Sequence, residues 1–266
     1  MKIPIYQVDA FTDTPFKGNP AAVCPLDAWP EDKLLLNIAR ENNLSETAFF
    51  VKKEDEYELR WFTPEAEVDL CGHATMAASY VIANKLEQDV EEINYNTESG
   101  KLRVVNKGDR LSMFFPSRPA EEFDDQSSKD IIREALEIEP DKILKSTRDY
   151  LVLYSSKKEI ENINPDMRIL EKLPGSPGII VSTATPDLEY DFISRFFAPA
   201  LGVPEDPVTG SAHCVLIPHW SDELNKDDLL AYQDSNRGGE LKCSDLGERV
   251  ELSGQAVIYL EGQIKV

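Results

Sequence analysis

The sequence predicts an α+β protein made of two similar halves. Three observations support this: short alternating apolar segments separated by turn residues, two helix candidates that each begin at a glycine, and a pentapeptide that occurs twice. Arg60-Trp61-Phe62-Thr63-Pro64 recurs as Arg195-Phe196-Phe197-Ala198-Pro199, an offset of 135 residues (60 to 195) in a chain of 266. Because the offset is about half the chain and each copy precedes a glycine-led helix candidate, the pattern favours a duplicated domain.

The first half contains several strand candidates and two helix candidates. Apolar residues at helical spacing over 34–39 predict an amphipathic helix, which the Asn42-Asn43 pair ends. The alanine-rich segment 76–84 follows Gly72, and its small side chains predict a central helix packed closely inside the sheet. The strands are expected over residues 3–10, 21–24, 47–51, 57–62, 93–97, 102–105 and 111–115.

The second half repeats this plan. The polar, proline-containing segment 117–128 is the expected linker, so the predicted domains are residues 1–117 and 118–266, with the option that the last strand returns to the first half. A helix from Ser128 and a helix led by Gly210 are expected. Strands are expected over residues 150–154 and 178–183, from Tyr190, and in the final segment 232–266.

Composition indicates a soluble cytoplasmic protein. The formal charge of −21 argues against nucleic acid or an anionic membrane as a partner, since both would repel the chain. No apolar run approaches the ~20 residues of a membrane span, and Pro4 and Asp9 interrupt the start of the chain before a signal-peptide core develops. The four cysteines lack the close paired spacing of zinc sites or disulfide scaffolds, which favours reduced thiols: Cys24, Cys71, Cys214 and Cys243.

The segment from Glu205 to Cys214 concentrates groups that suit a small-anion site. A glycine and hydroxyl turn that opens a helix leaves backbone N–H groups unpaired, and these bind anions. The first half offers a comparable turn at Cys71 to Thr75. We therefore expect two helix N-termini to aim donors into one cleft between the halves, which suits a carboxylate-bearing metabolite.

Several ordered motifs resemble those of the phenazine-biosynthesis PhzF family, and the likeness spans nearly the whole chain. The opening Val-Asp-Ala-Phe-Thr and Gly-Asn-Pro-Ala-Ala-Val also fit. The principal motifs are Ser-Glu-Thr at 45–47, Cys-Gly-His-Ala-Thr at 71–75, Asp-Pro-Val-Thr-Gly-Ser-Ala-His at 206–213 and Gln-x-Ser-x-Arg-Gly-Gly at 233–239.

This resemblance implies the diaminopimelate-epimerase-like fold, with two α+β halves that each wrap a curved, mostly antiparallel, barrel-like sheet around a central helix. It also implies a cofactor-independent isomerase that moves a proton between carbons with a glutamate, and Glu46 matches that residue's motif. A homodimer and a biosynthetic role are in keeping with the family. By the same matching, the other catalytic residues are His73 and Asp206, and the substrate-binding residues are Ser211, Gly72, Gly210, Thr209 and Ala74, with no metal.

Local sequence leaves structural alternatives open for these residues. Glu46 precedes Ala48-Phe49-Phe50, which predicts a desolvated carboxylate with a raised pKa, although a carboxylate at a strand edge is also compatible. Asp206 also suits a turn or helix cap, and Thr209 suits the cap of the Gly210 helix. Of the three histidines, His73 is the expected site residue, with His213 in a supporting position and His219 in helix-end packing.

Two other functions remain as alternatives. Cys71 precedes Gly72 where thiol racemases carry a catalytic cysteine, but the second half has Thr209 before its glycine, so a two-base cysteine mechanism is the runner-up. A binding protein that retains the fold without turnover is the third hypothesis. A metal site built from Cys71, His73, His213 and Cys214 has suitable ligand types, but their spacing does not require one.

Overall fold

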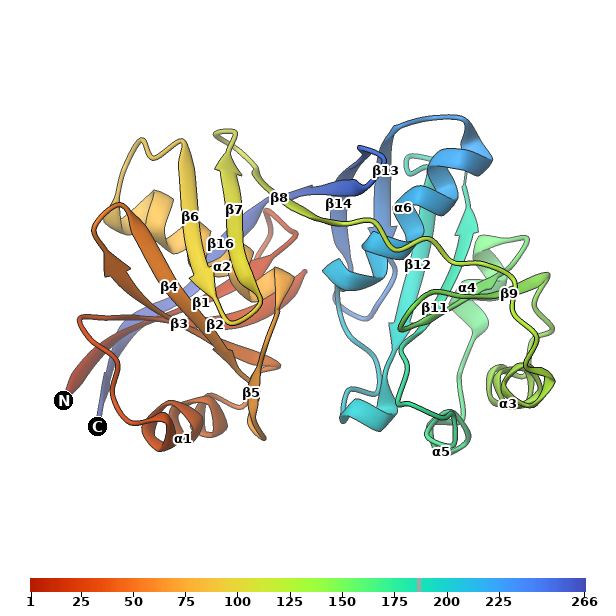
Figure 1. Ribbon diagram of the computed structural model, residues 1–266, viewed down its shortest axis with the longest axis horizontal. Coiled ribbons are helices and arrows are strands. Elements are labelled where there is room, and N and C mark those ends of the chain that lie inside the picture. Colours follow the sequence, from red (N-terminus) through yellow and green to blue (C-terminus); the bar gives the residue numbers. More distant parts are fainter. Residues whose placement is uncertain (186–187) are drawn as a thin grey trace. The chain divides into compact units, whose positions relative to one another are not determined.

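The computed structural model describes residues 1–185 and 188–266, and the chain divides into two compact units. Unit 1 comprises Met1–Phe114 with Leu252–Val266, and unit 2 comprises Phe115–Glu251. The expected division at residues 117 and 118 lies three residues after the observed one, and the C-terminal strand belongs to unit 1 (Figure 1). This strand pairs antiparallel with the first strand of the chain, from Lys2↔Lys265 to Ala10↔Ala256. The start and end of the chain therefore complete the same sheet.

Unit 1 has one sheet with the strand order β16-β1-β2-β3-β4-β6-β7-β8, and β5 pairs with β4. Its central helix is α2, which continues into the π-helical turn η1. The elements are β1 (Lys2–Ala10), β2 (Asn19–Leu26), α1 (Asp32–Asn42), β3 (Glu46–Lys53), β4 (Glu56–Phe62), β5 (Glu67–Val68), α2 (Gly72–Val81), η1 (Ile82–Leu86), β6 (Glu92–Thr97), β7 (Gly100–Asn106), β8 (Leu111–Pro116) and β16 (Ala256–Lys265).

Unit 2 has the strand order β15-β14-β13-β12-β11-β10-β9. Helix α6 occupies the place in this unit that α2 occupies in unit 1. The elements are α3 (Gln126–Leu136), β9 (Lys142–Lys145), β10 (Tyr150–Leu153), α4 (Lys157–Asn162), α5 (Met167–Leu170), β11 (Ile179–Ala184), β12 (Phe192–Phe197), the 3-10 turn η2 (Pro199–Leu201), α6 (Gly210–Leu224), β13 (Asp228–Gln233), β14 (Gly239–Asp245) and β15 (Arg249–Gly254).

The two units repeat the same sequence of strand directions. In unit 1, successive pairs from β1 to β7 run antiparallel, parallel, antiparallel, parallel and antiparallel. In unit 2, the pairs from β9 to β14 follow the identical order. Each parallel pair needs a crossover, and helices supply it at the same points in both units: α1 and α2 in one, α4 with α5 and α6 in the other.

The repeated pentapeptide occupies equivalent positions in this arrangement. Arg60 on β4 and Arg195 on β12 each lie over the ring of the phenylalanine two residues later, with 5.1 and 4.9 Å from Cζ to the ring centroid. Each guanidinium also makes a bidentate ion pair with a downstream glutamate, Glu67 or Glu205. The sequence repeat is therefore also a repeat of side-chain contacts, as a duplicated domain predicts.

Helix α2 is a core helix because its residues are small or apolar on all sides. Eight of its ten residues are buried, including Ala74, Ala77 and Ala78. Small side chains let the backbone approach the sheet closely, and α2 packs against β1, β2, β3 and β16. By contrast, α1 buries only one face, through Leu35, Ile38 and Ala39, as its periodicity predicts. Helix α2 therefore brings the residues of its first turn deep into unit 1.

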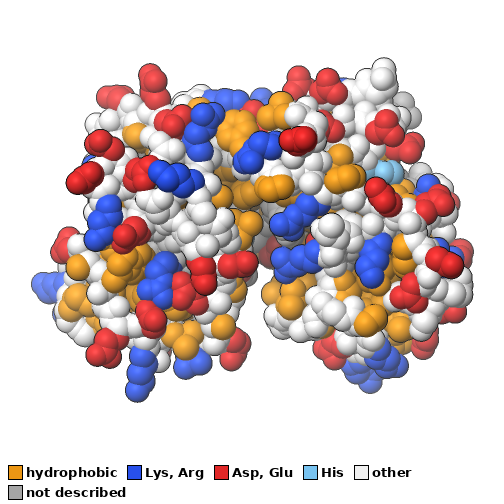
Figure 2. Space-filling view, viewed as in Figure 1, with side chains coloured by type: hydrophobic (Ala, Val, Ile, Leu, Met, Phe, Trp, Pro, Cys, Tyr) orange, Lys and Arg blue, Asp and Glu red, His pale blue; other side chains and the backbone are white. Residues whose placement is uncertain are grey.

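Acidic side chains are spread over the face of both units seen in Figure 2, with lysine and arginine between them. This distribution agrees with the formal charge of −21. Among the described residues, no helix is both long and apolar enough to cross a membrane.

Candidate active site

The two glycine-led helices begin without a side-chain cap from the preceding residue. Cys71 and Thr209 hold these positions with extended backbones, φ −144° and ψ 110° for Cys71 and φ −116° and ψ 102° for Thr209. The expectation that Thr209 caps α6 is wrong, because its hydroxyl donates to Asp206 Oδ2 at 2.5 Å. Neither preceding side chain therefore competes for the first-turn amides of Gly72 or Gly210, which agrees with a role in binding an anion.

Glu46 and His73 meet in unit 1. Glu46 is the first residue of β3 and His73 the second residue of α2, two elements that pack together. His73 Nε2 lies 3.1 Å from Glu46 Oε2, and the two side chains are 8% and 18% exposed. Among the described residues, neither atom has a hydrogen bond of good geometry, so this ion-pair contact is the main polar contact of each. On the other side of the ring, His73 Nδ1 lies 3.5 Å from Cys71 Sγ.

The contact keeps both partners charged at neutral pH. Burial raises the pKa of Glu46, but the positive charge of His73 and the polar contacts of His73 and Cys71 outweigh it, so the pKa is lowered overall. Burial lowers the pKa of His73, yet Cys71 and Glu46 together raise it well above its ordinary value. The expectation of a raised pKa for Glu46 is therefore wrong, since local sequence could not show that His73 would face it.

Glu46, Cys71 and His73 also form a group of metal-type ligands, with one ligand atom from each within 4.8 Å of the others. The imidazole uses different nitrogens toward its two neighbours, Nδ1 toward Cys71 and Nε2 toward Glu46. A metal ion takes a single nitrogen from a histidine ring, so the observed contacts suit hydrogen bonding better than one shared ion. His213 and Cys214, the other residues of the metal alternative, lie on α6 in unit 2.

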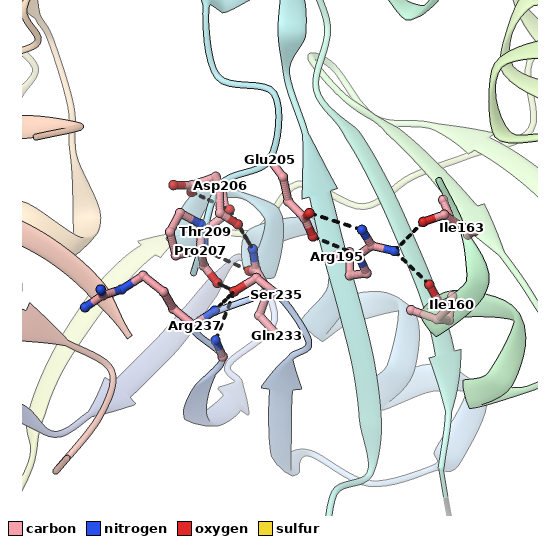
Figure 3. A network of polar contacts seen from close by, with 11 residues as sticks. Ile160, Ile163, Arg195, Glu205, Asp206, Pro207, Thr209, Gln233, Ser235 and Arg237 are labelled. Atoms are coloured by element: carbon pink, nitrogen blue, oxygen red, sulfur yellow. Dashed lines mark hydrogen bonds and ion pairs between the residues drawn. The ribbon is translucent and has the colours of Figure 1, made fainter. Parts of the chain in front are cut away.

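In unit 2, a buried glutamine fixes the loop before α6 (Figure 3). Gln233 is fully buried, and its Oε1 accepts from the Thr209 N–H at 2.8 Å. Its Nε2 donates to the Asp206 carbonyl at 2.8 Å and to Thr209 Oγ1 at 3.0 Å. Two residues later, Ser235 Oγ donates to the Pro207 carbonyl at 2.8 Å. The turn after β13 thus holds the segment that carries Asp206 in a single conformation.

Glu205 anchors the other end of this segment. Its carboxylate accepts from Arg195 Nε at 2.7 Å and from Nη2 at 3.1 Å. The same guanidinium donates through Nη1 to the carbonyls of Ile160 and Ile163, as Figure 3 shows. Bidentate pairs of this kind fix geometry as well as charge. Asp206 is therefore held from both sides, by strand β12 and by the turn after β13.

Comparison with known proteins adds a family to this geometry. Residues 8–262 match the model of PhzC-PhzF, phenazine biosynthesis-like proteins. The chain belongs to this family. It is 48% identical to a Pseudomonas aeruginosa protein named as an uncharacterized isomerase, over 99% of both chains. These findings confirm the predicted family and identify an isomerase.

Solved structures confirm the predicted fold. A PhzF family protein from Enterococcus faecalis superposes with a TM-score of 0.95 at 40% identity, covering 100% of both chains. A predicted epimerase from Pseudomonas aeruginosa has a TM-score of 0.76 at 18% identity over 99% of both chains, which shows a shared fold. The α+β class with epimerase-like architecture is therefore confirmed for this PhzF family chain.

The predicted site residues of the PhzF chain fall into two groups. Unit 1 holds Glu46 at the start of β3, with Gly72, His73 and Ala74 in the first turn of α2. The residues in unit 2 are Asp206, the N-cap Thr209, and Gly210 and Ser211 in the first turn of α6. Ala74 is fully buried, which leaves only its backbone for ligand contacts, whereas Ser211 is half-buried.

The remaining histidines have structural contacts. His213 is fully buried, and its Nδ1 lies 2.8 Å from the Thr209 carbonyl. Burial lowers its pKa to about 4, so the ring is neutral and Nδ1–H donates to that carbonyl. His219 packs edge-on against the ring of Trp220. His213 thus contacts the backbone of Thr209, whereas His219 lies within α6 and not at its end, so the expected helix-end position of His219 is wrong.

The polar contacts of Gln233 and Cys71 in this PhzF protein were not predicted from the sequence. Gln233 appeared only as part of a family-like motif at a turn, although its spacing of two residues from Ser235 marked a polar pattern at the end of a strand. Cys71 was expected to be a packed thiol, and it is buried, but it also contacts His73. Gln233 contacts a segment more than twenty residues earlier in the sequence, and Cys71 contacts His73 across the turn that opens α2. Local sequence patterns predict neither contact.

Proposed function

We propose that this PhzF family isomerase moves a proton between two carbons of a small, carboxylate-bearing metabolite, without a cofactor, using Glu46 as the proton carrier. The observation that carries this proposal is the 3.1 Å contact between Glu46 and His73 at the head of α2. It keeps the Glu46 carboxylate ionised and so ready to accept a proton. Glu46 is also the less buried partner, with 18% of its side chain exposed.

The proposed reaction has two steps. Glu46 first removes a proton from a carbon of the substrate, and the electron pair left behind delocalises into the neighbouring unsaturated system. The protonated Glu46 then returns that proton to a second carbon, which completes the isomerisation and restores the carboxylate. The chain's own carboxylate supplies all the proton transfer, so the atoms balance with no other reagent.

The other predicted residues bind and orient the substrate in this proposal. His73, positively charged, stabilises negative charge as it develops. Asp206 and Ser211 position the substrate, and the loop contacts of Asp206 support this because they fix its backbone before any ligand arrives. The first-turn amides from Gly72 in unit 1 and from Gly210 in unit 2 are each proposed as anion-binding donors, with Ala74 and Thr209 at the respective helix ends.

The two-base thiol mechanism has less support from the structure. Burial raises the pKa of Cys71, and the nearby Glu46 raises it further, which disfavours the thiolate that such a mechanism needs. The equivalent position in unit 2 is Thr209, and burial raises the pKa of Cys214 to about 12. A second reactive thiol is therefore not supported at the head of α6.

The proposal is tested by incubating the protein with a panel of carboxylate metabolites in D2O and measuring deuterium incorporation by mass spectrometry. We expect incorporation into one of them, and Glu46→Gln should reduce the rate about 10²–10⁴-fold because a general base is lost. The matched control is Glu41→Gln, an exposed residue of α1. Unchanged turnover in Glu46→Gln would refute the role of Glu46, and ligand binding without deuterium incorporation would indicate a binding protein.

A further inference from the structure

Cys71 contacts both members of the Glu46–His73 pair. Its sulfur lies 3.5 Å from His73 Nδ1 and within 4.8 Å of a Glu46 carboxylate oxygen. The side chain is buried, with 7% of the residue exposed. Thr75 Oγ1 donates to the Cys71 carbonyl at 2.6 Å, which ties the Cys71 backbone to the first turn of α2. The backbone of Cys71 is therefore fixed, and its buried sulfur lies against His73.

The protonation state of the pair determines the direction of these hydrogen bonds. A positively charged histidine carries a hydrogen on both ring nitrogens and accepts none. Nε2–H then lies beside the Glu46 carboxylate, with 3.1 Å between Nε2 and Oε2, and Nδ1–H has Cys71 Sγ as its neighbour. The two nitrogens flank Cε1 and face different partners, so rotation of the imidazole would move both away from these partners. The thiol remains protonated, since its pKa is raised.

Other titratable groups near α2 do not replace these contacts. The strands that pack on α2 carry Asp9 on β1 and Cys24 on β2, while β16 carries Glu261 in an ion pair with Lys85. The neighbours that raise the pKa of His73 are Cys71 and Glu46. Cys71 is thus the partner on the Nδ1 side of the ring.

We propose that Cys71 is a positioning residue, whose thiol accepts from His73 Nδ1–H and thereby keeps Nε2 in ion-pair contact with the Glu46 carboxylate. This assigns the cysteine before Gly72 a role different from that of a catalytic thiol, because the sulfur stays bonded to its own hydrogen and forms no bond to substrate. The inference rests on the proposed function for its effect on turnover, but the arrangement of the three side chains can be measured without a substrate.

The test is the NMR titration of His73 in wild-type protein, Cys71→Ala and Cys71→Ser. The chain has only three histidines, and the other two have lowered pKa values, so His73 is the ring that titrates highest. Signal loss in His73→Asn confirms the assignment. We expect a lower midpoint in Cys71→Ala, because the charged ring loses an acceptor, and recovery toward the wild-type midpoint in Cys71→Ser, whose hydroxyl also accepts.

Turnover is measured as deuterium exchange across pH with the same variants. We expect Cys71→Ala to lose about 10-fold in kcat/KM, with the alkaline limb of its pH profile moving together with the His73 midpoint, and Cys71→Ser to regain most of the rate. Cys24→Ala is the matched control, a buried thiol on β2 in the same unit, and should leave the His73 midpoint unchanged. It controls for the loss of a buried thiol.

Three outcomes would overturn the proposal. An unchanged His73 midpoint in Cys71→Ala shows that the sulfur does not hold the ring. A shift of equal size in Cys24→Ala shows a general packing effect. Loss of more than about 1,000-fold in both Cys71 variants with an unchanged midpoint shows a chemical role for the thiol. Failure of the proposed function is separate, because it appears as unchanged exchange in Glu46→Gln whatever the His73 titration shows.

Discussion

Gln233→Leu is expected to destabilise unit 2 by about 2–5 kcal/mol, because a buried backbone N–H and a part-buried backbone carbonyl lose their partners. Gln233 is fully buried, and its amide serves the Thr209 N–H, the Asp206 carbonyl and Thr209 Oγ1. Leucine has a similar size, so it leaves the volume filled while it removes these hydrogen bonds. Each unpaired backbone group costs about 1–3 kcal/mol, and the added apolar surface offsets a small part.

Urea unfolding followed by fluorescence measures this change, since Trp220 is the single tryptophan of unit 2 and is buried on α6. Gln263→Leu on β16 is the matched control, because Gln263 is an exposed strand residue, and its effect should stay below about 0.5 kcal/mol. A loss below about 1 kcal/mol in Gln233→Leu, or one equal to that of the control, would refute the reasoning that Gln233 holds the Asp206 loop.

Further substitutions test two part-buried arginines and one buried aspartate. Arg195→Lys should cost more stability in urea unfolding than Arg60→Lys, about 2 against about 1 kcal/mol, because only Arg195 also donates to two backbone carbonyls; equal losses would contradict this. Asp149→Asn should be about 1 kcal/mol more stable than wild type at pH 7, since burial raises the pKa of Asp149 and its charged form is disfavoured in the folded state. The Asn oxygen still accepts from the Gly178 N–H. The gain should begin as pH rises above 3.8, the ordinary pKa, and vanish below it; a pH-independent difference would contradict this origin.

The sequence by itself determined the local elements and the duplication. Helix α1 follows from apolar residues at helical spacing, and α2 from a glycine followed by small side chains, because each pattern acts within a few residues. The repeated pentapeptide also marked equivalent strands, β4 and β12. Family motifs then predicted the site residues, including Glu46 and His73. Short segments of sequence and their spacing along the chain were enough for these inferences.

Only the tertiary structure decided how those residues interact. The charge state of Glu46 depends on His73, which is 27 positions away in sequence (46 to 73) and 3.1 Å away in space. Local sequence predicted desolvation of Glu46 but not the opposite charge that outweighs it. The hydroxyl of Thr209 likewise bonds to Asp206 because Gln233, on a later strand, fixes the loop. The pKa of a group and its hydrogen-bond partners depend on which residues the fold brings within a few ångströms of it. Local sequence does not specify those neighbours when they come from distant segments.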